Sequence, residues 1–207
     1  MDVFVSDKTY YNVLGALKKY KKQGFNMGIV DLWLPIVVSA AACWVMSAII
    51  WTALKYHNSD YKKTADEEGV RAALKGNAPG YYLLPYCLDP GDLKNPEVKQ
   101  KYDEGPLAYI TMLPNGVPAM AGKLVSMFVY FIVVGIVCAY FVSRTLAPDA
   151  DYLAVFRVAG TVAFIASSFA VVQESIWFGR PWSITIKTFI DALIYALLTG
   201  GVFGWLV

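Results

Sequence analysis

Four long apolar runs dominate this chain and limit what it can fold into. They cover residues 28–55, 122–144, 152–176 and 183–206. A helix of about 20 apolar residues crosses the hydrocarbon core of a bilayer, and each run reaches that length. Because lipid offers no hydrogen-bond partner to backbone groups, a spanning segment of this kind must be helical. We therefore expect a mainly α membrane protein with four transmembrane helices.

The composition points to a bilayer as well. Hydrophobic residues make up 57% of the chain and charged residues only 16%, whereas soluble domains carry about 25% charged residues. The net charge of +2 is too small to indicate a nucleic-acid partner, and the sequence has no basic helix or phosphate-binding glycine loop. The expected partners are the lipid bilayer and other membrane protein subunits, and no nucleic acid.

Residues 56–121 are the only sizeable polar stretch, and they predict a small extramembrane α/β lobe between the first two spans. A capping box, Thr64-x-x-Glu67, opens one expected helix. Asn95 and Pro96 suit the N-cap and first position of another. Two runs rich in Tyr, Leu and Ile are expected strands, Tyr81–Cys87 and Leu107–Leu113. About 60 residues are few for an independent hydrophobic core, so we expect contacts with the membrane helices or with a partner to stabilise the lobe.

The first 27 residues are polar and basic. Apolar side chains recur there at the spacing of one helix face, which predicts an amphipathic helix on the membrane surface. A solvated tail is the alternative. The first apolar run is too long for the core of a signal peptide, so we expect it to remain as a spanning helix. The lysines of this segment are Lys8, Lys18, Lys19, Lys21 and Lys22.

Ionisable residues in the last two spans require an explanation, because a charge near a helix centre costs about 2.5–3.5 kcal/mol on insertion scales. Lys187 and Asp191 are four residues apart, hence on one helix face and able to pair. Glu174 is expected at the same depth across the corner. Arg157 lies five residues inside the third span, from which it either reaches the headgroups or lines a pathway. These four residues form a candidate charge network, read either as an ion or proton relay or as a structural link between helices.

The corner between the third and fourth spans is aromatic. Trp177, Arg180 and Trp182 predict an interfacial belt, with Arg180 near lipid headgroups or stacked on an indole. The lysines before the first span and Arg144 after the second favour cytoplasmic N- and C-termini and a periplasmic lobe. Lys55, Lys62, Lys63 and Lys123 flank the lobe and favour the opposite orientation.

Small residues mark helix faces that a neighbouring helix can approach closely. Ser39, Cys43 and Ser47 recur at every fourth position of the first span. Gly200-x-x-x-Gly204 is a close-approach motif near the end of the fourth span. We expect both faces to pack against other helices.

No catalytic residue, metal or cofactor is expected, apart from bound lipids. His57 is the only histidine. A Ser-His-Asp triad would therefore have to include it, and a metal site with several histidines is excluded within one chain. His57 with Asp60 and the acidic run 66–68 has no known ligand spacing, and those acids suit the first turn of a helix without a metal. Cys87 would need a neighbouring base to act as a nucleophile.

Several segments resemble a group of uncharacterised bacterial multi-pass inner-membrane proteins with no assigned activity. The resemblance implies a bacterial inner (cytoplasmic) membrane and a four-helix architecture, and it carries over no catalytic residue. The segments are 57–63 (HNSDYKK), 66–68 (DEE), 152–161 (YLAVFRVAGT), 175–182 (SIWFGRPW), 191–195 (DALIY) and 203–205 (FGW).

Three classes of function remain open. The leading hypothesis is a non-catalytic accessory or scaffold subunit of a larger bacterial membrane assembly, which should be extracted with stoichiometric partners. The alternative is a small oligomeric transporter or channel component that uses the charged residues of the last two spans. A membrane enzyme with the 57–60 region at the interface is the third. Replacement of Asp191 by Asn separates the first two, since only a transporter would lose flux while staying folded.

Overall fold

The computed structural model describes residues 28–207, and the expected amphipathic segment 1–27 lies outside the described residues. The chain divides into two compact units. We call the part up to Asn58 and from Ala121 onward the membrane unit, and Ser59–Met120 the lobe. The four apolar runs fall in the membrane unit, and the polar stretch falls in the lobe except for residues 56–58 and 121, which belong to the membrane unit.

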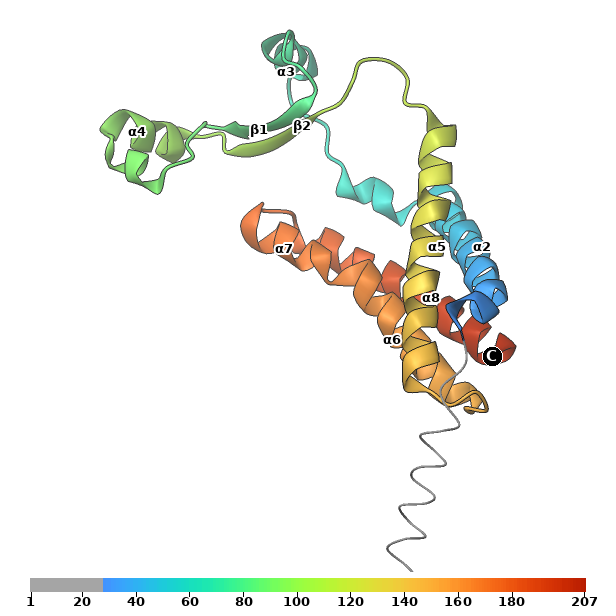
Figure 1. Cartoon of the computed structure of the whole chain (residues 1–207). Coiled ribbons are helices and arrows are strands. Elements are labelled where there is room, and N and C mark those ends of the chain that lie inside the picture. Colours follow the sequence, from blue (N-terminus) through green and yellow to red (C-terminus); the bar gives the residue numbers. More distant parts are fainter. Residues whose placement is uncertain (1–27) are drawn as a thin grey trace, which may run out of the picture. The chain divides into compact units, whose positions relative to one another are not determined.

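The membrane unit contains four long helical spans within the described residues (Figure 1). All four are long and apolar enough to cross a bilayer. The expected mainly α membrane fold is therefore confirmed, and the four helices indicate a multi-pass membrane protein. The first span joins η1 (Ile29–Leu32), α2 (Trp33–Ile49) and the π-helical turn η2 (Ile50–Leu54); the others are α5 (Met120–Thr145), α6 (Tyr152–Ser168) with α7 (Ala170–Trp177), and α8 (Trp182–Leu206).

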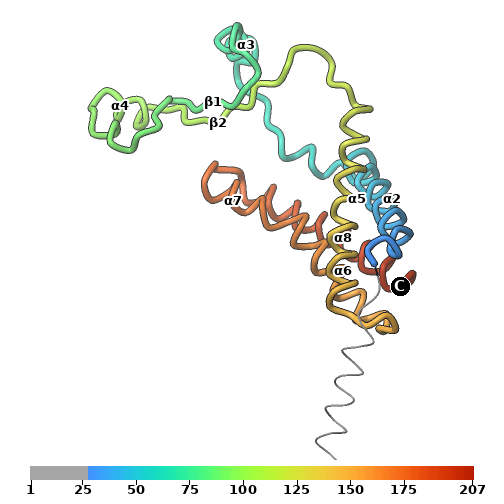
Figure 2. Tube along the Cα trace, viewed as in Figure 1, coloured from blue at the N-terminus to red at the C-terminus, as the bar shows by residue number. Residues whose placement is uncertain are grey.

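Helices α6 and α8 lie side by side (Figures 1 and 2), and glycines let their backbones meet. A Cβ atom on Gly200 would lie 2.8 Å from the Phe156 carbonyl oxygen, and one on Gly204 would lie 2.8 Å from the Tyr152 ring. A Cβ atom on Gly160 of α6 would lie 3.8 Å from the Cα atom of Gly200. The glycine motif of the fourth span thus contacts α6 of the same chain.

The small-residue face of α2 packs against α8. Ser39, Cys43 and Ser47 are all buried. The Cys43 sulfur lies 3.5 Å from the Tyr195 carbonyl oxygen and 3.4 Å from the Thr199 hydroxyl oxygen. Small side chains on α2 therefore bring its backbone close to the middle of α8.

Helix α5 is joined to both neighbours through backbone carbonyl groups. The Trp44 indole N–H of α2 donates to the Leu124 carbonyl at 2.9 Å, and the Cys138 thiol donates to the Ala159 carbonyl of α6 at 3.4 Å. Apolar packing between the spans forms the main core. It consists of Leu32, Ile36, Val134, Cys138, Ala139, Val142, Val155, Ala159, Ala163, Ala196 and Phe203.

The lobe combines short helices with one two-stranded antiparallel sheet. In the sheet, Gly80 lies opposite Met112 and Leu84 opposite Ala108. Both strands are shorter than expected, and β1 ends before Pro85 because proline has no N–H for the ladder. The elements are α3 (Glu67–Leu74), β1 (Gly80–Leu84), η4 (Pro90–Lys94), α4 (Pro96–Glu104) and β2 (Ala108–Met112).

The two lobe helices begin at side-chain caps. The expected cap of α3 is wrong: Asp66, not Thr64, accepts the Gly69 N–H, at 2.9 Å. A carboxylate at this position also interacts favourably with the positive end of the helix dipole. The expected start of α4 is confirmed, since Asn95 is the N-cap and Pro96 the first helical residue.

Candidate functional site: an aspartate cluster between the first and fourth spans

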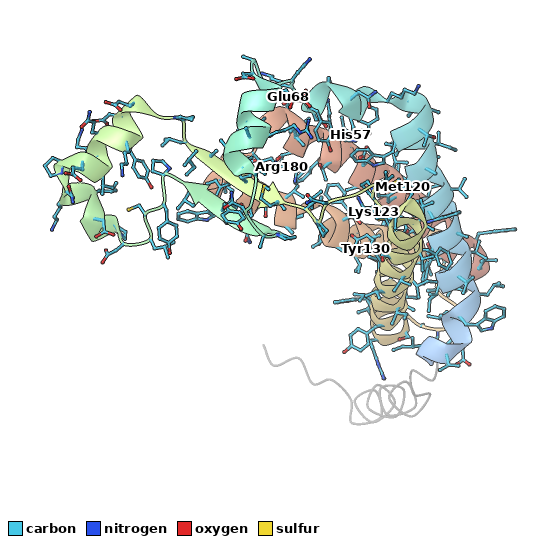
Figure 3. The ribbon with its side chains drawn as sticks, turned by 90° about the horizontal axis from the view of Figure 1, so that it is seen from above. His57, Glu68, Met120, Lys123, Tyr130 and Arg180 are labelled. Atoms are coloured by element: carbon cyan, nitrogen blue, oxygen red, sulfur yellow. The ribbon has the colours of Figure 1, made fainter. Side chains whose placement is uncertain are left out.

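The end of the first span turns out of its helix axis. In η2 the Lys55 N–H donates to the Ile50 carbonyl at 3.2 Å. Lys55 has a φ of 53°, a left-handed conformation that costs a residue other than glycine about 1–2 kcal/mol. The 3-10 turn η3 (Tyr56–Asp60) follows directly. Tyr56 and His57 are thereby carried away from the axis of α2. His57, which Figure 3 labels, is buried.

Both side chains contact the carboxylate of Asp191 on α8. The Tyr56 hydroxyl donates to Asp191 Oδ1, and His57 Nε2 lies 2.8 Å from Asp191 Oδ2. Only 6% of Asp191 and 3% of His57 is exposed. Asp191 lies nine residues after the start of α8, about 13 Å along the helix axis. A carboxylate well inside a span is therefore held by the segment that follows another span.

Lys187 and Trp51 complete this arrangement. Lys187 Nζ donates to the Tyr56 carbonyl oxygen at 2.9 Å and lies 6.0 Å from the centre of the Tyr56 ring. The Trp51 indole stacks on the His57 ring, with centroids 4.3 Å apart and planes 9° from parallel. We call Trp51, Tyr56, His57, Lys187 and Asp191 the aspartate cluster. Two charged residues of one α8 face thus meet the same short segment.

The contacts explain how ionisable groups are tolerated in this span. A buried polar group without a partner costs about 1–3 kcal/mol, and among residues 28–207 no buried side-chain nitrogen or oxygen lacks a hydrogen bond. The bond between His57 and Asp191 holds one proton. The proton is on His57 Nε2 when the carboxyl group of Asp191 is ionised, and on Asp191 Oδ2 when His57 Nε2 is unprotonated. The cluster can therefore fasten two spans together and can also hold a proton.

The other sequence-predicted charges lie outside the aspartate cluster. Arg157 on α6 and Glu174 on α7 are exposed. The Glu174 carbonyl oxygen accepts the Arg180 backbone N–H at 3.2 Å and so helps to form the corner before α8. At that corner Trp177 is 73% and Trp182 55% exposed, as an interfacial belt requires. The structure thus brings Lys187 and Asp191 to one cluster and leaves Arg157 and Glu174 on the surface.

Two members of the cluster, Trp51 and Tyr56, are absent from the sequence-based candidates. His57 is considered there only as a metal-binding or catalytic residue. The sequence does contain a local pattern that could have indicated these residues: three ring side chains occur within residues 51–57 (WTALKYH) at the end of the first span. Four spans that alternate in direction place this end and the start of the fourth span on the same side of the membrane. Ring side chains at that level are therefore natural partners for a polar residue of the fourth span.

The lobe presents an open, partly apolar surface. Across Ser59–Met120, all of which the structure describes, no residue is buried. Tyr81 and Tyr109 stack on one face of the sheet with ring centroids 5.9 Å apart. A groove of about 710 Å³ lies between α3 and the residues that follow β2. Further exposed apolar side chains are Tyr86, Leu88, Leu107, Leu113 and Val117.

Three of the candidate metal and nucleophile residues of the lobe, Asp66, Glu68 and Cys87, make local contacts. Asp66 caps α3, and Glu68 pairs with Arg71 at 2.8 Å. The Cys87 thiol donates to the Asp89 carbonyl at 3.3 Å. Within the described part of the chain, no group of three or more His, Cys, Asp or Glu side chains is arranged to hold a metal ion.

Comparisons with known proteins assign no role to these residues. No protein-family model, curated protein or solved structure matches the chain. The chemistry of the aspartate cluster follows from its own contacts, a carboxylate between a phenol and an imidazole inside a membrane span.

Proposed function

We propose that this protein is a non-catalytic accessory or scaffold subunit of a larger membrane protein assembly. The main support for this proposal is that no residue of the lobe, from Ser59 to Met120, is buried. An isolated two-stranded sheet is only marginally stable in water, and a unit of about 60 residues needs an efficient core to fold alone. A partner that covers the lobe would supply the burial that the lobe lacks.

The most suitable docking surface is the sheet. Its stacked tyrosines, Tyr81 and Tyr109, are 60% and 45% exposed, and aromatic side chains are enriched at the centres of protein interfaces. Among residues 28–207 the sheet has two strands, and a strand of the partner can add to its outer edge. The partner we propose is therefore another protein subunit.

We place the lobe outside the bilayer, in the periplasm, with both termini in the cytoplasm of a bacterial cell. Unpaired strand edges are not tolerated in hydrocarbon, which supports an extramembrane lobe. The lysine-rich segment 1–27 and Arg144 support the orientation. The resemblance to bacterial inner-membrane proteins supports the choice of membrane.

Native mass spectrometry of gently solubilised source membranes, with a tag at the C-terminus, tests the proposal. We expect a heteromeric mass with a fixed stoichiometry. The double variant Tyr81→Ser/Tyr109→Ser should lose the partner. The control Tyr61→Ser changes a tyrosine that is 74% exposed elsewhere in the lobe, and it should keep the partner. A lone protein that is active in liposomes would contradict the proposal.

A second candidate function, a small oligomeric transporter or channel component, is favoured by the aspartate cluster. A buried carboxylate that shares a proton with an imidazole is the kind of group that proton pathways use. In proteoliposomes, Asp191→Asn should then abolish ion flux while folding and assembly persist. Glu174→Gln, at an exposed position on α7, is the matched control. Loss of folded Asp191→Asn protein would assign the cluster a structural role instead.

A further inference from the structure

An apolar groove follows the start of α8 on the side away from the aspartate cluster. It has a volume of about 460 Å³. At least half of the surface of Ile186, Ile190 and Trp182 is exposed, as expected of a surface that faces lipid. Its lining includes Phe164 of α6, Val172 of α7, and Trp182, Ile186, Ile190 and Leu193 of α8, together with Thr185 and Phe189.

The groove matches the depth of one lipid leaflet. From Trp182 to Leu193 it covers eleven residue steps of α8, or about 16 Å at 1.5 Å per residue. Half of a hydrocarbon core of about 30 Å is about 15 Å. Since Trp182 belongs to the aromatic corner at the membrane surface, the groove extends from that surface to about the middle of the bilayer. A single acyl chain has the shape and the apolar character to occupy it.

A cation precedes the first groove residue of α8 in the chain. Arg180 precedes Trp182 by two residues, so their Cα atoms are at most about 7 Å apart. Arg180 is half-buried. Its backbone N–H is used by Glu174, but within residues 28–207 its guanidinium makes no hydrogen bond or ion pair, including with the Glu174 carboxylate. A guanidinium group binds phosphate oxygens through paired N–H donors.

We propose that the corner and the groove together form a phospholipid site, with one acyl chain along α8 and the phosphate on Arg180. Apolar length and charge both support this occupant. The groove supplies contact over one leaflet, and the arginine supplies an anion-binding group at headgroup depth. An anionic phospholipid is favoured over a zwitterionic one, because its headgroup brings no ammonium group into the vicinity of Arg180.

Native mass spectrometry of the full chain, exchanged into equimolar phosphatidylglycerol and phosphatidylcholine, tests the site. The wild type should retain one phosphatidylglycerol per chain as detergent is stripped. Ile190→Trp fills the groove and should abolish that retention, whereas Leu197→Trp, at an exposed α8 position outside the groove, should not. Arg180→Gln should lower the preference for phosphatidylglycerol about fivefold, and the control Arg157→Gln should leave it unchanged.

Two results from these lipid measurements would overturn the proposal. One is equal lipid retention by the wild type and Ile190→Trp, with both proteins monodisperse and equally resistant to heat. The other is an unchanged lipid preference in Arg180→Gln. Should Ile190→Trp fail to fold, Ile190→Phe and Ile186→Phe fill the same groove with smaller rings and give the same reading. Co-purification of a protein subunit in place of the lipid, released by the groove variants, would also reject the lipid occupant.

Discussion

Asp191 is the residue whose replacement should reduce stability most, because buried His57 and partly buried Tyr56 both bond to its carboxylate. Asp191→Ala leaves the Tyr56 hydroxyl and His57 Nε2 without their shared acceptor. We expect it to lower the free energy of unfolding by about 2–4 kcal/mol, since it removes two hydrogen bonds to a charged, buried acceptor and each such loss costs about 1–3 kcal/mol. Asp191→Asn keeps an oxygen for Tyr56 and should cost about 1 kcal/mol. Thermal unfolding in detergent measures both.

The control for this series is Leu197→Ala, which shortens an exposed side chain on the same helix. It should unfold close to the wild type because little apolar contact is lost. If Asp191→Ala also matched the wild type, the aspartate cluster would contribute nothing to stability. The left-handed strain at Lys55 would then lack the compensation that we assign to the contacts of Tyr56 and His57.

At the level of elements, the contact between α6 and α8 can be tested by replacing two adjacent glycines, Gly200 and Gly201, with alanine. A Cβ atom on Gly200 would lie 2.8 Å from a backbone oxygen, whereas one on Gly201 would find only the Tyr152 hydroxyl oxygen, at 3.8 Å. Gly200→Ala should therefore destabilise the protein by about 1–3 kcal/mol through overpacking. Gly201→Ala should be neutral or stabilising by up to about 1 kcal/mol, because alanine favours helix.

The unfolding midpoints of the two alanine variants in one detergent settle the comparison. Gly204→Ala should behave like Gly200→Ala, since its Cβ atom would lie 2.8 Å from the Tyr152 ring. Equal midpoints for Gly200→Ala and Gly201→Ala would mean that the two helices separate readily. In that case the glycine motif would not hold α6 and α8 together.

For the whole molecule, the orientation of the lobe can be measured with the native cysteines. Cys43 and Cys138 are buried in the helical core, whereas Cys87 is half-buried in the lobe. A membrane-impermeant maleimide should therefore label intact spheroplasts at Cys87 if the lobe is periplasmic. Cys87→Ser should remove the signal, because burial shields the other two thiols. Labelling only after the membrane is broken would place the lobe in the cytoplasm.

The four spans could be predicted because lipid imposes a local requirement. Each span must satisfy its own backbone hydrogen bonds, so about 20 consecutive apolar residues are sufficient evidence for a helix. The caps of the lobe are also local, although two acidic or hydroxyl residues can compete for one helix start. Asp66 rather than Thr64 caps α3, because its carboxylate both accepts the N–H and interacts with the helix dipole.

The partners of the charged residues depended on tertiary structure. Tyr56 and Asp191 are separated by 135 positions, and no periodicity along the chain links them. Their contact requires the π-helical turn at the end of the first span, the left-handed Lys55 and the approach of α2 to α8 through Cys43. Which polar groups meet inside the bundle follows from the packing of whole helices, whereas the presence of those helices follows from the chemistry of each segment with lipid.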